Sequence, residues 1–529
     1  MGDEARRRMR LASPMRAEGS GGVAHYSDRL LVSTDRGDIT NKAARIRSGN
    51  TSSYGRSVRR TPPACQVPLR RCFTLLCLLL LVRCGGGEAP APEAGLPNLV
   101  LIVADDLGYN DLGSYWTAEP NREDARIKTP NLDRIAREGM RFTGFYAAAP
   151  ICTPSRAALM TGSYPQRIGM SKLEGQEVAG VITRESTIGL NPREITLAEI
   201  LKPLGYATAM IGKWHLGKFN QFSPAEQGFD LDFGPVDYAE DLTSADLRRN
   251  CEVLPGRVER ADFTRHLTEE AVRFIRGNAS RPFFLTLAHF LPHVPYVVPA
   301  EFRGISARGA YGDAVMVLDW STGRIVEVLE ELGLTGRTLV LFTSDNGGLL
   351  GSGGGGSNYP LRGGKGSAFE GGFRVPCLAW WPGTIPPAET AALATQLDIY
   401  PTFAALAGAA LPDDRTIDGR NIWPLMSGQE NAASPRDAFF YFRLGRLQAV
   451  RSGDWKLHFG EDGTPHMLFN LHRDVGERTN LRDRHPDTVQ RLQRIAEKMR
   501  GEIGDAATGI RGSNTRPAGF VIDGVLQDD

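Results

Sequence analysis

Polar side chains follow four apolar segments of this sequence, at the point where each segment ends. Each segment has the length of a strand, and the groups that follow are carboxylates, a carboxamide, an ammonium and imidazoles. They are Asp105 and Asp106 after residues 99–104, Lys213 and His215 after 207–211, His289 and His293 within and after 283–290, and Asp345 and Asn346 after 339–343. Because the carboxyl ends of strands in an open α/β sheet line one crevice, the sequence predicts a single site.

The acids of this group predict a metal. Asp105 and Asp106 alone are typical of a strand-end turn, but Asp345 and Asn346 at a second strand end favour a cation. Three carboxylates and a carboxamide are hard oxygen ligands, and a buried cluster of acids needs a counter-charge. We expect one divalent cation, with calcium preferred and magnesium as the other candidate.

A further group lies at the predicted start of a helix. Pro154 suits a first helical turn and Gly162 suits a helix end, which puts Cys152 at the N-terminus. Backbone N–H groups favour an anion there, and Arg156, one turn on, can point at the same position. Taken alone, a cysteine at a helix start is typical of a small buried apolar side chain.

The pentapeptide CTPSR (residues 152–156), followed by AALMTG and by Tyr164–Arg167, resembles the activation signature of the type I sulfatases, in which the cysteine becomes Cα-formylglycine. Residues 212–217 (GKWHLG) and 361–366 (LRGGKG), with EGG at 370–372, extend the resemblance over about residues 97–481. Within the family the sequence is most similar to arylsulfatase A and its relatives. The resemblance implies an alkaline-phosphatase-like fold and hydrolysis of sulfate monoesters, aryl or carbohydrate.

Carried over residue by residue, the resemblance also implies roles. The metal ligands are Asp105, Asp106, Asp345, Asn346 and the modified Cys152. The catalytic residues are Cys152 as the aldehyde hydrate, Arg156 and Lys213 at the hydrate and sulfate, His215 as the base, and His293 and Lys365 at the sulfate and the leaving oxygen. One hydroxyl of a hydrate can attack sulfur while the second breaks down the adduct. His289 is interpreted as a packing or supporting residue.

Two alternatives stay open. One is a phosphomonoester or phosphonate hydrolase of the same superfamily, and the other is an inactive sulfate-binding protein. A single-metal set argues against a two-zinc phosphatase, and the intact matched positions argue against an inactive protein. We expect a sulfated small molecule or saccharide as substrate and a formylglycine-generating activity of the host as a partner. Loops 174–193 and 219–255 are expected to recognise the alcohol, although they carry no recognisable motif.

The elements that must position these residues alternate along the chain. From Leu96 onward, apolar segments of strand length alternate with helical patterns, which is typical of a parallel or mixed sheet covered by helices on both faces. After about Pro435, a hairpin-like stretch (439–460) and a helical pattern (488–504) predict a small α+β subdomain. The predicted division is a disordered or mis-assigned extension (1–69), a signal and tether (70–95), a catalytic domain (96–434), and a C-terminal subdomain with a loose tail (435–529).

Composition sets the wider limits. With 529 residues and 41% hydrophobic side chains, the chain is neither disordered nor a small disulfide scaffold. Residues 1–71 hold 15 basic and 6 acidic side chains; since the formal net charge is +1, the remainder carries −8 and offers no basic face for nucleic acid. Cys251 and Cys377 are the cysteines available for a disulfide, and nothing in the sequence decides whether they pair.

A targeting segment is the last sequence feature. Arg70 and Arg71 precede an apolar run (72–82) too short to span a bilayer, which resembles a secretory signal. Cys84 and the Gly/Ala/Pro tether after it resemble the lipid-attachment site of bacterial lipoproteins, although Arg83 stands where such signals carry a small residue. We expect an exported protein, periplasmic, membrane-anchored or secreted, and the lipid anchor stays open.

Overall fold

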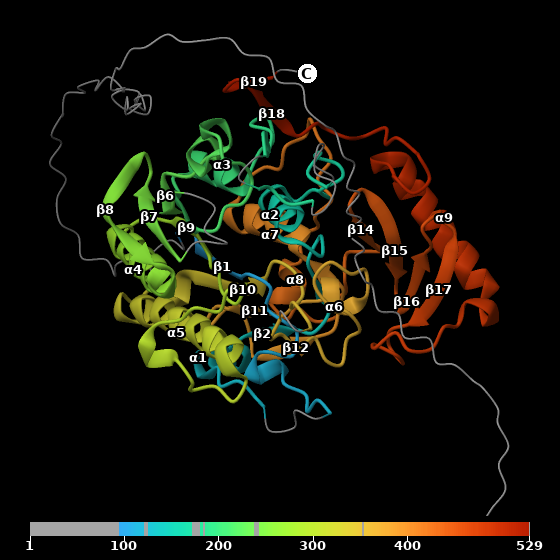
Figure 1. The fold of residues 1–529 in the computed structure, drawn as a ribbon, viewed down its shortest axis with the longest axis horizontal. Coiled ribbons are helices and arrows are strands. Elements are labelled where there is room, and N and C mark those ends of the chain that lie inside the picture. Colours follow the sequence, from blue (N-terminus) through green and yellow to red (C-terminus); the bar gives the residue numbers. More distant parts are fainter. Residues whose placement is uncertain are drawn as a thin grey trace, which may run out of the picture. The chain divides into compact units, whose positions relative to one another are not determined.

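The computed structural model describes residues 95–120, 125–171, 180–183, 186–236, 243–351 and 354–527 (Figure 1). The predicted extension, the signal and Cys84 lie outside these residues. No helix within the described ranges is both long and apolar enough to cross a membrane.

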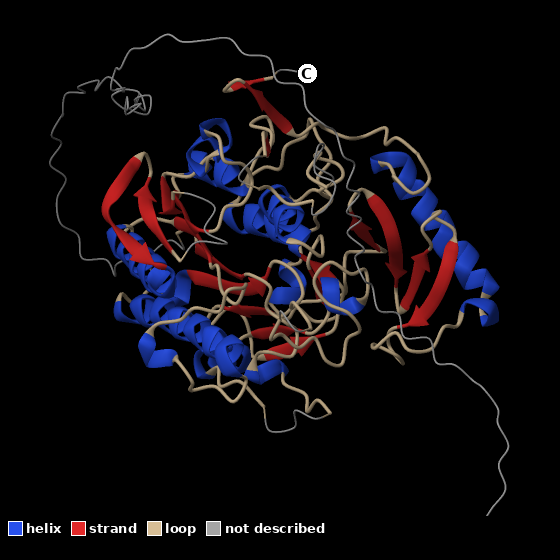
Figure 2. Cartoon of the chain, viewed as in Figure 1, coloured by secondary structure: helices blue, strands red, loops and turns tan. Residues whose placement is uncertain are grey.

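A ten-stranded mixed sheet forms the centre of the main body (Figure 2). In spatial order the strands are β12 (Ala388–Thr390), β2 (Met140–Phe142), β11 (Cys377–Trp380), β10 (Thr338–Ser344), β1 (Asn98–Ala104), β9 (Phe283–Ala288), β5 (Ala207–Gly212), β6 (Leu231–Pro235), β7 (Ser244–Arg249) and β8 (Glu252–Glu259). The five strands from β10 to β6 run parallel, and β11, β7 and β8 run antiparallel to their inner neighbours. The fully buried apolar sequence of β1, NLVLIVA, suits a strand covered on both faces.

Helices cover both faces of this sheet, as the alternation of segments predicts. Val100 and Ile102 of β1 point into one core, and Leu99 and Leu101 point into the other. The first core includes side chains of α1 (Pro130–Glu138), α4 (Phe263–Gly277) and α5 (Gly309–Glu331). The second includes side chains of α2 (Cys152–Thr161), α3 (Leu197–Leu201), α7 (Ile399–Ala407) and α8 (Trp423–Met426).

A small C-terminal α+β unit packs against the main body through its own apolar cluster. Its antiparallel sheet consists of β14 (Phe439–Arg443), β15 (Arg446–Ser452), β16 (Trp455–Phe459) and β17 (Pro465–Asn470), and α9 (Pro486–Ile503) covers it. Tyr146 and Phe373 of the main body belong to the same cluster as Phe439 and Tyr441 of β14. Tyr146 lies in β3 (Phe145–Tyr146), which pairs with β13 (Ala394–Thr395), and Phe373 ends α6 (Glu370–Phe373).

One expectation is corrected at this level, and one open question is answered. The tail after Asp505 is not loose: β18 (Gly519–Ile522) pairs with β4 (Ile188–Gly189) and with β19 (Val525–Leu526), and Arg516 forms an ion pair with Glu194 at 2.6 Å. The pair Cys251–Cys377 does not form, because Cys377 is a buried free thiol on β11.

Candidate active site

The ends of four parallel strands lie level with one another at one edge of the sheet. Ala104, the last residue of β1, is paired with Ser344 of β10, and Ala288 of β9 is paired with both Val103 and Gly212. The next residues therefore emerge side by side. The structure brings together Asp105 and Asp106, Lys213, and Asp345 and Asn346, as the sequence predicts, and it buries all five almost completely.

The start of α2 faces this edge. Cys152 is the first residue of the helix, and its Sγ lies 3.6 Å from Asp105 Oδ1. Arg156, one turn further, donates from Nε to Asp345 Oδ2 at 2.9 Å and from Nη1 to the carbonyl of Lys213 at 2.7 Å. The helix ends at Gly162 in the left-handed conformation, as predicted. One short helix thus carries both the thiol and a guanidinium to the acids.

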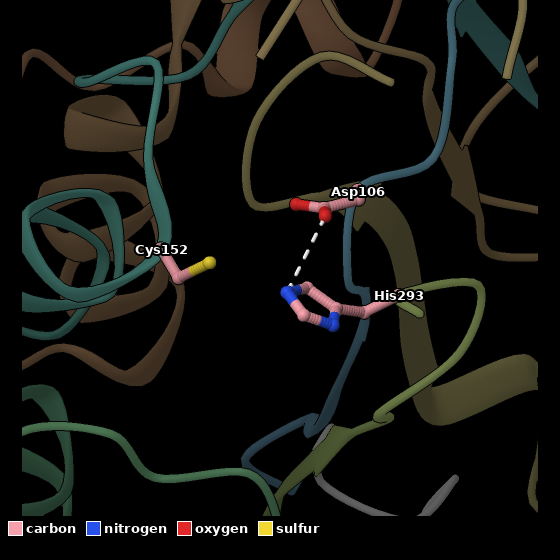
Figure 3. A group of neighbouring side chains, drawn as sticks. All are labelled: Asp106, Cys152 and His293. Carbon is pink, nitrogen blue, oxygen red and sulfur yellow. Dashed lines mark ion pairs between the residues drawn. The ribbon is translucent and has the colours of Figure 1, made fainter. Parts of the chain in front are cut away.

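Two ammonium groups and one imidazole complete the cluster. Lys213 Nζ lies 2.7 Å from Asp105 Oδ2, and Lys365 Nζ lies 2.7 Å from Asp106 Oδ2. His293 directs Nε2 toward the same Asp106 oxygen at 3.6 Å, and the Cys152 thiol points toward this pair (Figure 3). His293 Nδ1 is 2.7 Å from the carbonyl of Val294; a carbonyl only accepts, so Nδ1 carries the proton there.

His215 lies beside the same helix start. Its Nε2 is 2.8 Å from the carbonyl of Ile182, so Nε2 is the donor and Nδ1 carries the lone pair when the ring is neutral. Its own carbonyl accepts from Thr153 Oγ1 at 3.1 Å, which ties the residue to the turn that holds Cys152. His215 and Asp106 both have a positive φ, 62° and 66° respectively. This backbone conformation is uncommon for residues other than glycine and is frequent at functional sites.

His289 does not reach this cluster. Its ring is fully buried, with Nε2 3.3 Å from Ser321 Oγ of α5, and burial lowers its pKa to about 3. His289 is therefore a buried residue that is neutral in the folded protein.

The electrostatics of the acids favour a cation among them. Burial raises the pKa of Asp345, Arg156 opposes the rise and repulsion from Asp105 adds to it, which leaves the pKa at about 6. Burial also raises the pKa of Asp105, but Lys213 and His293 lower it, and its net pKa lies well below the ordinary value.

Burial raises the pKa of the Cys152 thiol well above its usual range, so the unmodified side chain is neutral.

The residues present fit a hard divalent ion. Carboxylates of Asp105 and Asp345 lie within 4.8 Å of one another and of Cys152 Sγ. Asn346 donates from Nδ2 to Asp106 Oδ1, and among the described residues its buried Oδ1 has no hydrogen-bond partner. An oxygen acceptor left without a donor beside three carboxylates is the arrangement that an oxygen-seeking cation satisfies.

One supporting residue was missed from the sequence. Gln396 accepts from Ser155 Oγ at 2.6 Å and donates to the carbonyl of Ser344 at 2.6 Å, so it joins α2 to the end of β10. Its only signal is a polar residue before an apolar helix pattern, and that signal does not specify either partner.

The sequence is similar to those of known sulfatases. The sulfatase family model matches residues 97–409, and that of the N-sulphoglucosamine sulphohydrolase C-terminal region matches 364–505. N-acetylgalactosamine-6-sulfatase of Canis lupus familiaris is 38% identical over 79% of this chain and 87% of its own length. Arylsulfatase A of Homo sapiens is 37% identical over 81% of this chain and 92% of its own.

Solved structures agree with these relatives. The structure of Ps i-CgsB in complex with k-i-k-neocarrahexaose matches with a TM-score of 0.69 and 32% identity, over 80% of this chain and 95% of that one. The phosphonate monoester hydrolase SpPMH of Silicibacter pomeroyi, from the class named as the alternative, shares the fold at 18% identity with a TM-score of 0.59. The family model matches more than half of this chain, and relatives above 30% identity cover most of it. The chain therefore belongs to the sulfatase family.

Proposed function

We propose that this protein hydrolyses sulfate monoesters of carbohydrates, with a nucleophile made from Cys152. The observation that carries the proposal is the Cys152 thiol at the N-terminus of α2, 3.6 Å from Asp105 and one turn from Arg156. A buried neutral thiol is a weak nucleophile, whereas a formylglycine hydrate at the same position has two hydroxyl groups.

The proposed reaction has two steps, a displacement at sulfur and an elimination. In the first, one hydroxyl of the hydrate passes its proton to a neighbouring carboxylate, Asp105 or Asp345, as its oxygen bonds to sulfur. The bond from sulfur to the alcohol oxygen breaks, and His293 or Lys365 gives that oxygen a proton. In the second, His215 accepts the proton of the other hydroxyl through Nδ1, the bond between the hydrate carbon and the sulfate oxygen breaks, and the aldehyde re-forms. Water then restores the hydrate.

Four residues would hold the cation: Asp105, Asp106, Asp345 and Asn346, together with an oxygen of modified Cys152. The bound ion would supply fixed positive charge next to the nucleophile, and the all-oxygen ligand set favours calcium, with magnesium as the other candidate. Arg156, Lys213 and Lys365 would stabilise the negative sulfate oxygens, each by about 3 kcal/mol in the transition state.

The relatives support a saccharide substrate. One solved structure at 32% identity is named as a complex with a neocarrahexaose, and a 38% identical relative is named for an N-acetylgalactosamine sulfate. We also propose that the protein is exported and that its modification depends on a formylglycine-generating activity of the host.

The test is sulfate release from 4-nitrophenyl sulfate and from a panel of sulfated oligosaccharides, with 4-nitrophenyl phosphate and phenyl phosphonate alongside. Wild-type protein made with a formylglycine-generating enzyme should release sulfate and carry an aldehyde at residue 152 by mass spectrometry; Cys152→Ala should lose nearly all turnover. Faster release of phosphate than of sulfate, or an active enzyme with an unmodified thiol, would overturn the proposal.

A further inference from the structure

A cavity of about 220 Å³ opens beside the active site, at the carboxyl ends of β5 and β6. Its walls include Lys213 and His215 on one side and Asp232 and Arg248 on the other. Lys213 is the residue whose Nζ bonds Asp105, so the cavity and the cluster of acids share a wall. Lys213 and His215 take part in the proposed chemistry at Cys152, whereas Asp232 and Arg248 have no role in it.

The register of β6 and β7 creates the polar wall. Arg248 is paired with Gly234, and Asp232 lies two residues before that glycine, so all three lie on one face of the sheet. Gly234 has no side chain, and Arg248 extends across it to contact Asp232, with Nη2 2.6 Å from Oδ2. Among the described residues only this nitrogen of the guanidinium is hydrogen-bonded, although the group has five N–H donors.

Aromatic rings form the apolar part of the lining. Trp214 donates a hydrogen bond from Nε1 to the carbonyl of Phe222 at 2.7 Å. Its ring also makes an edge-to-face contact with Phe229, with the ring centroids 5.9 Å apart. Phe290, two residues after β9, packs on Phe263 with the ring centroids 6.1 Å apart. The lining also includes the cation of Lys218. Rigid aromatic faces next to charged hydrogen-bonding groups suit a sugar ring, and the further N–H donors of the Arg248 guanidinium favour an anionic one.

We infer that this cavity is a subsite for a second, anionic sugar ring, attached to the sugar whose sulfate is removed. The inference rests on the proposed function and narrows its substrate to sulfated oligosaccharides that carry another sulfate or a carboxylate. The volume is below the roughly 300–1,000 Å³ of sites for drug-sized ligands, so it admits one ring rather than a longer stretch of chain. Arg248 is then the specificity-determining residue.

The experiment compares two substitutions with opposite expected signs. Arg248→Met removes the cation and should weaken the binding of anionic oligosaccharides. Asp232→Asn removes the carboxylate that neutralises Arg248, so the binding of the same oligosaccharides should be preserved or strengthened. Arg257→Met on β8, an exposed arginine outside the cavity, is the matched control. Each is made in wild-type protein for kinetics and in Cys152→Ala protein for binding.

The probes are sulfated di- to hexasaccharides of carrageenan, chondroitin sulfate and heparan sulfate, with 4-nitrophenyl sulfate as the small substrate. For the oligosaccharide with the highest wild-type kcat/KM, Arg248→Met should lower that value at least about tenfold, mainly through KM, and should change 4-nitrophenyl sulfate turnover less than about twofold. Calorimetry on the Cys152→Ala background should show the same loss of affinity.

Three results would overturn the inference: an equal loss on both substrate types, no loss on either, or no oligosaccharide bound by the Cys152→Ala protein. A fall in oligosaccharide affinity with Asp232→Asn as large as that with Arg248→Met would also overturn it, because damage to the fold would explain both. If the wild-type protein released no sulfate from any ester, the proposed function would fail, while calorimetry would still report on the cavity.

Discussion

Charge at the active site is balanced residue by residue. Each of the three buried carboxylates contacts a cation: Asp105 contacts Lys213, Asp106 contacts Lys365 and Asp345 contacts Arg156. A metal ion bound to the same oxygens would release donors of these side chains for the substrate's sulfate. The carboxylates would then bind the metal ion, and the lysines and Arg156 would bind the sulfate.

Calcium should therefore stabilise the folded protein. At a free concentration one hundred times its dissociation constant, an ion that binds only the folded state adds about 2.7 kcal/mol. We expect a higher melting temperature with calcium and loss of activity on chelation. Asn346→Ala removes a neutral ligand and should reduce the calcium-induced shift, whereas stoichiometric zinc by metal analysis or full activity after chelation would contradict the assignment.

His293 and Lys365 are the candidates for the acid that protonates the departing alcohol. If His293 is the donor, His293→Ala should slow the release of alkyl sulfates by about 100-fold or more, and that of 4-nitrophenyl sulfate far less, because a nitrophenolate leaves without a proton. The comparison of kcat/KM for the two ester types decides the matter. Equal losses would make His293 a sulfate-binding residue and Lys365 the acid.

Buried His289 gives the fold a pH dependence of its own. Its folded pKa of about 3 lies below the ordinary value of 6.5, so only the unfolded chain takes up this proton between those values, and stability is lost as pH falls. Between pH 7 and pH 5 the loss from this group is about 2 kcal/mol. In urea unfolding, the free energy of unfolding of His289→Leu should fall less from pH 7 to pH 5 than that of the wild type. An equal fall in both proteins would contradict the prediction.

At the scale of elements, the parallel centre of the sheet was predictable and its margins were not. β1, β5, β9 and β10 are continuous apolar segments, and the common direction of parallel strands brings their final residues to one edge. The short strands β2 and β11 pair antiparallel, an arrangement that depends on partners far along the chain. Arg516 and Glu194 are likewise 322 residues apart, so the packing of the tail could not be deduced from its polar local sequence.

The Gly-rich loop that carries Lys365 depends on the C-terminal unit. The loop leads into α6, whose first residue, Glu370, accepts from Lys456 Nζ at 2.9 Å. The same ammonium lies 3.0 Å from Glu477, which also accepts from the backbone N–H of Glu370 at 2.6 Å. Burial raises the pKa of Glu370, and Lys456 with nearby arginines brings it down to about 2. One buried ammonium thus joins the two units.

Lys456→Met should leave the buried carboxylates of Glu370 and Glu477 without the ammonium that contacts both of them. Because an unpaired buried charge is costly, the free energy of unfolding should fall by about 3–5 kcal/mol. Denaturant unfolding measures this, with the exposed Lys498→Met in α9 as a control that should change stability by less than about 0.5 kcal/mol. A loss as small as that of the control would show that the ion pairs do not hold the loop.

On the scale of the whole molecule, export is the outstanding prediction. It depends on the series of basic residues, apolar segment, Cys84 and tether, all of which precede the described residues. Fractionation of a bacterial host should find the protein outside the cytoplasm, and labelled palmitate should be incorporated into the wild type but not into Cys84→Ser. A cytosolic protein that retains residues 1–95 would contradict export.

The order of the strands in space has a consequence for the timing of biosynthesis. β1 leaves the ribosome long before its neighbours, since β9 begins at Phe283 and β10 at Thr338. At about 5–20 residues per second, the interval before β9 is made is roughly 10–35 s. During that interval the segment around Cys152 has no finished sheet to bury it, whereas in the folded protein the residue is only 2% exposed. If Cys152 is converted to formylglycine as proposed, the modifying enzyme would have access to the nascent chain until β1 pairs with β9 and β10.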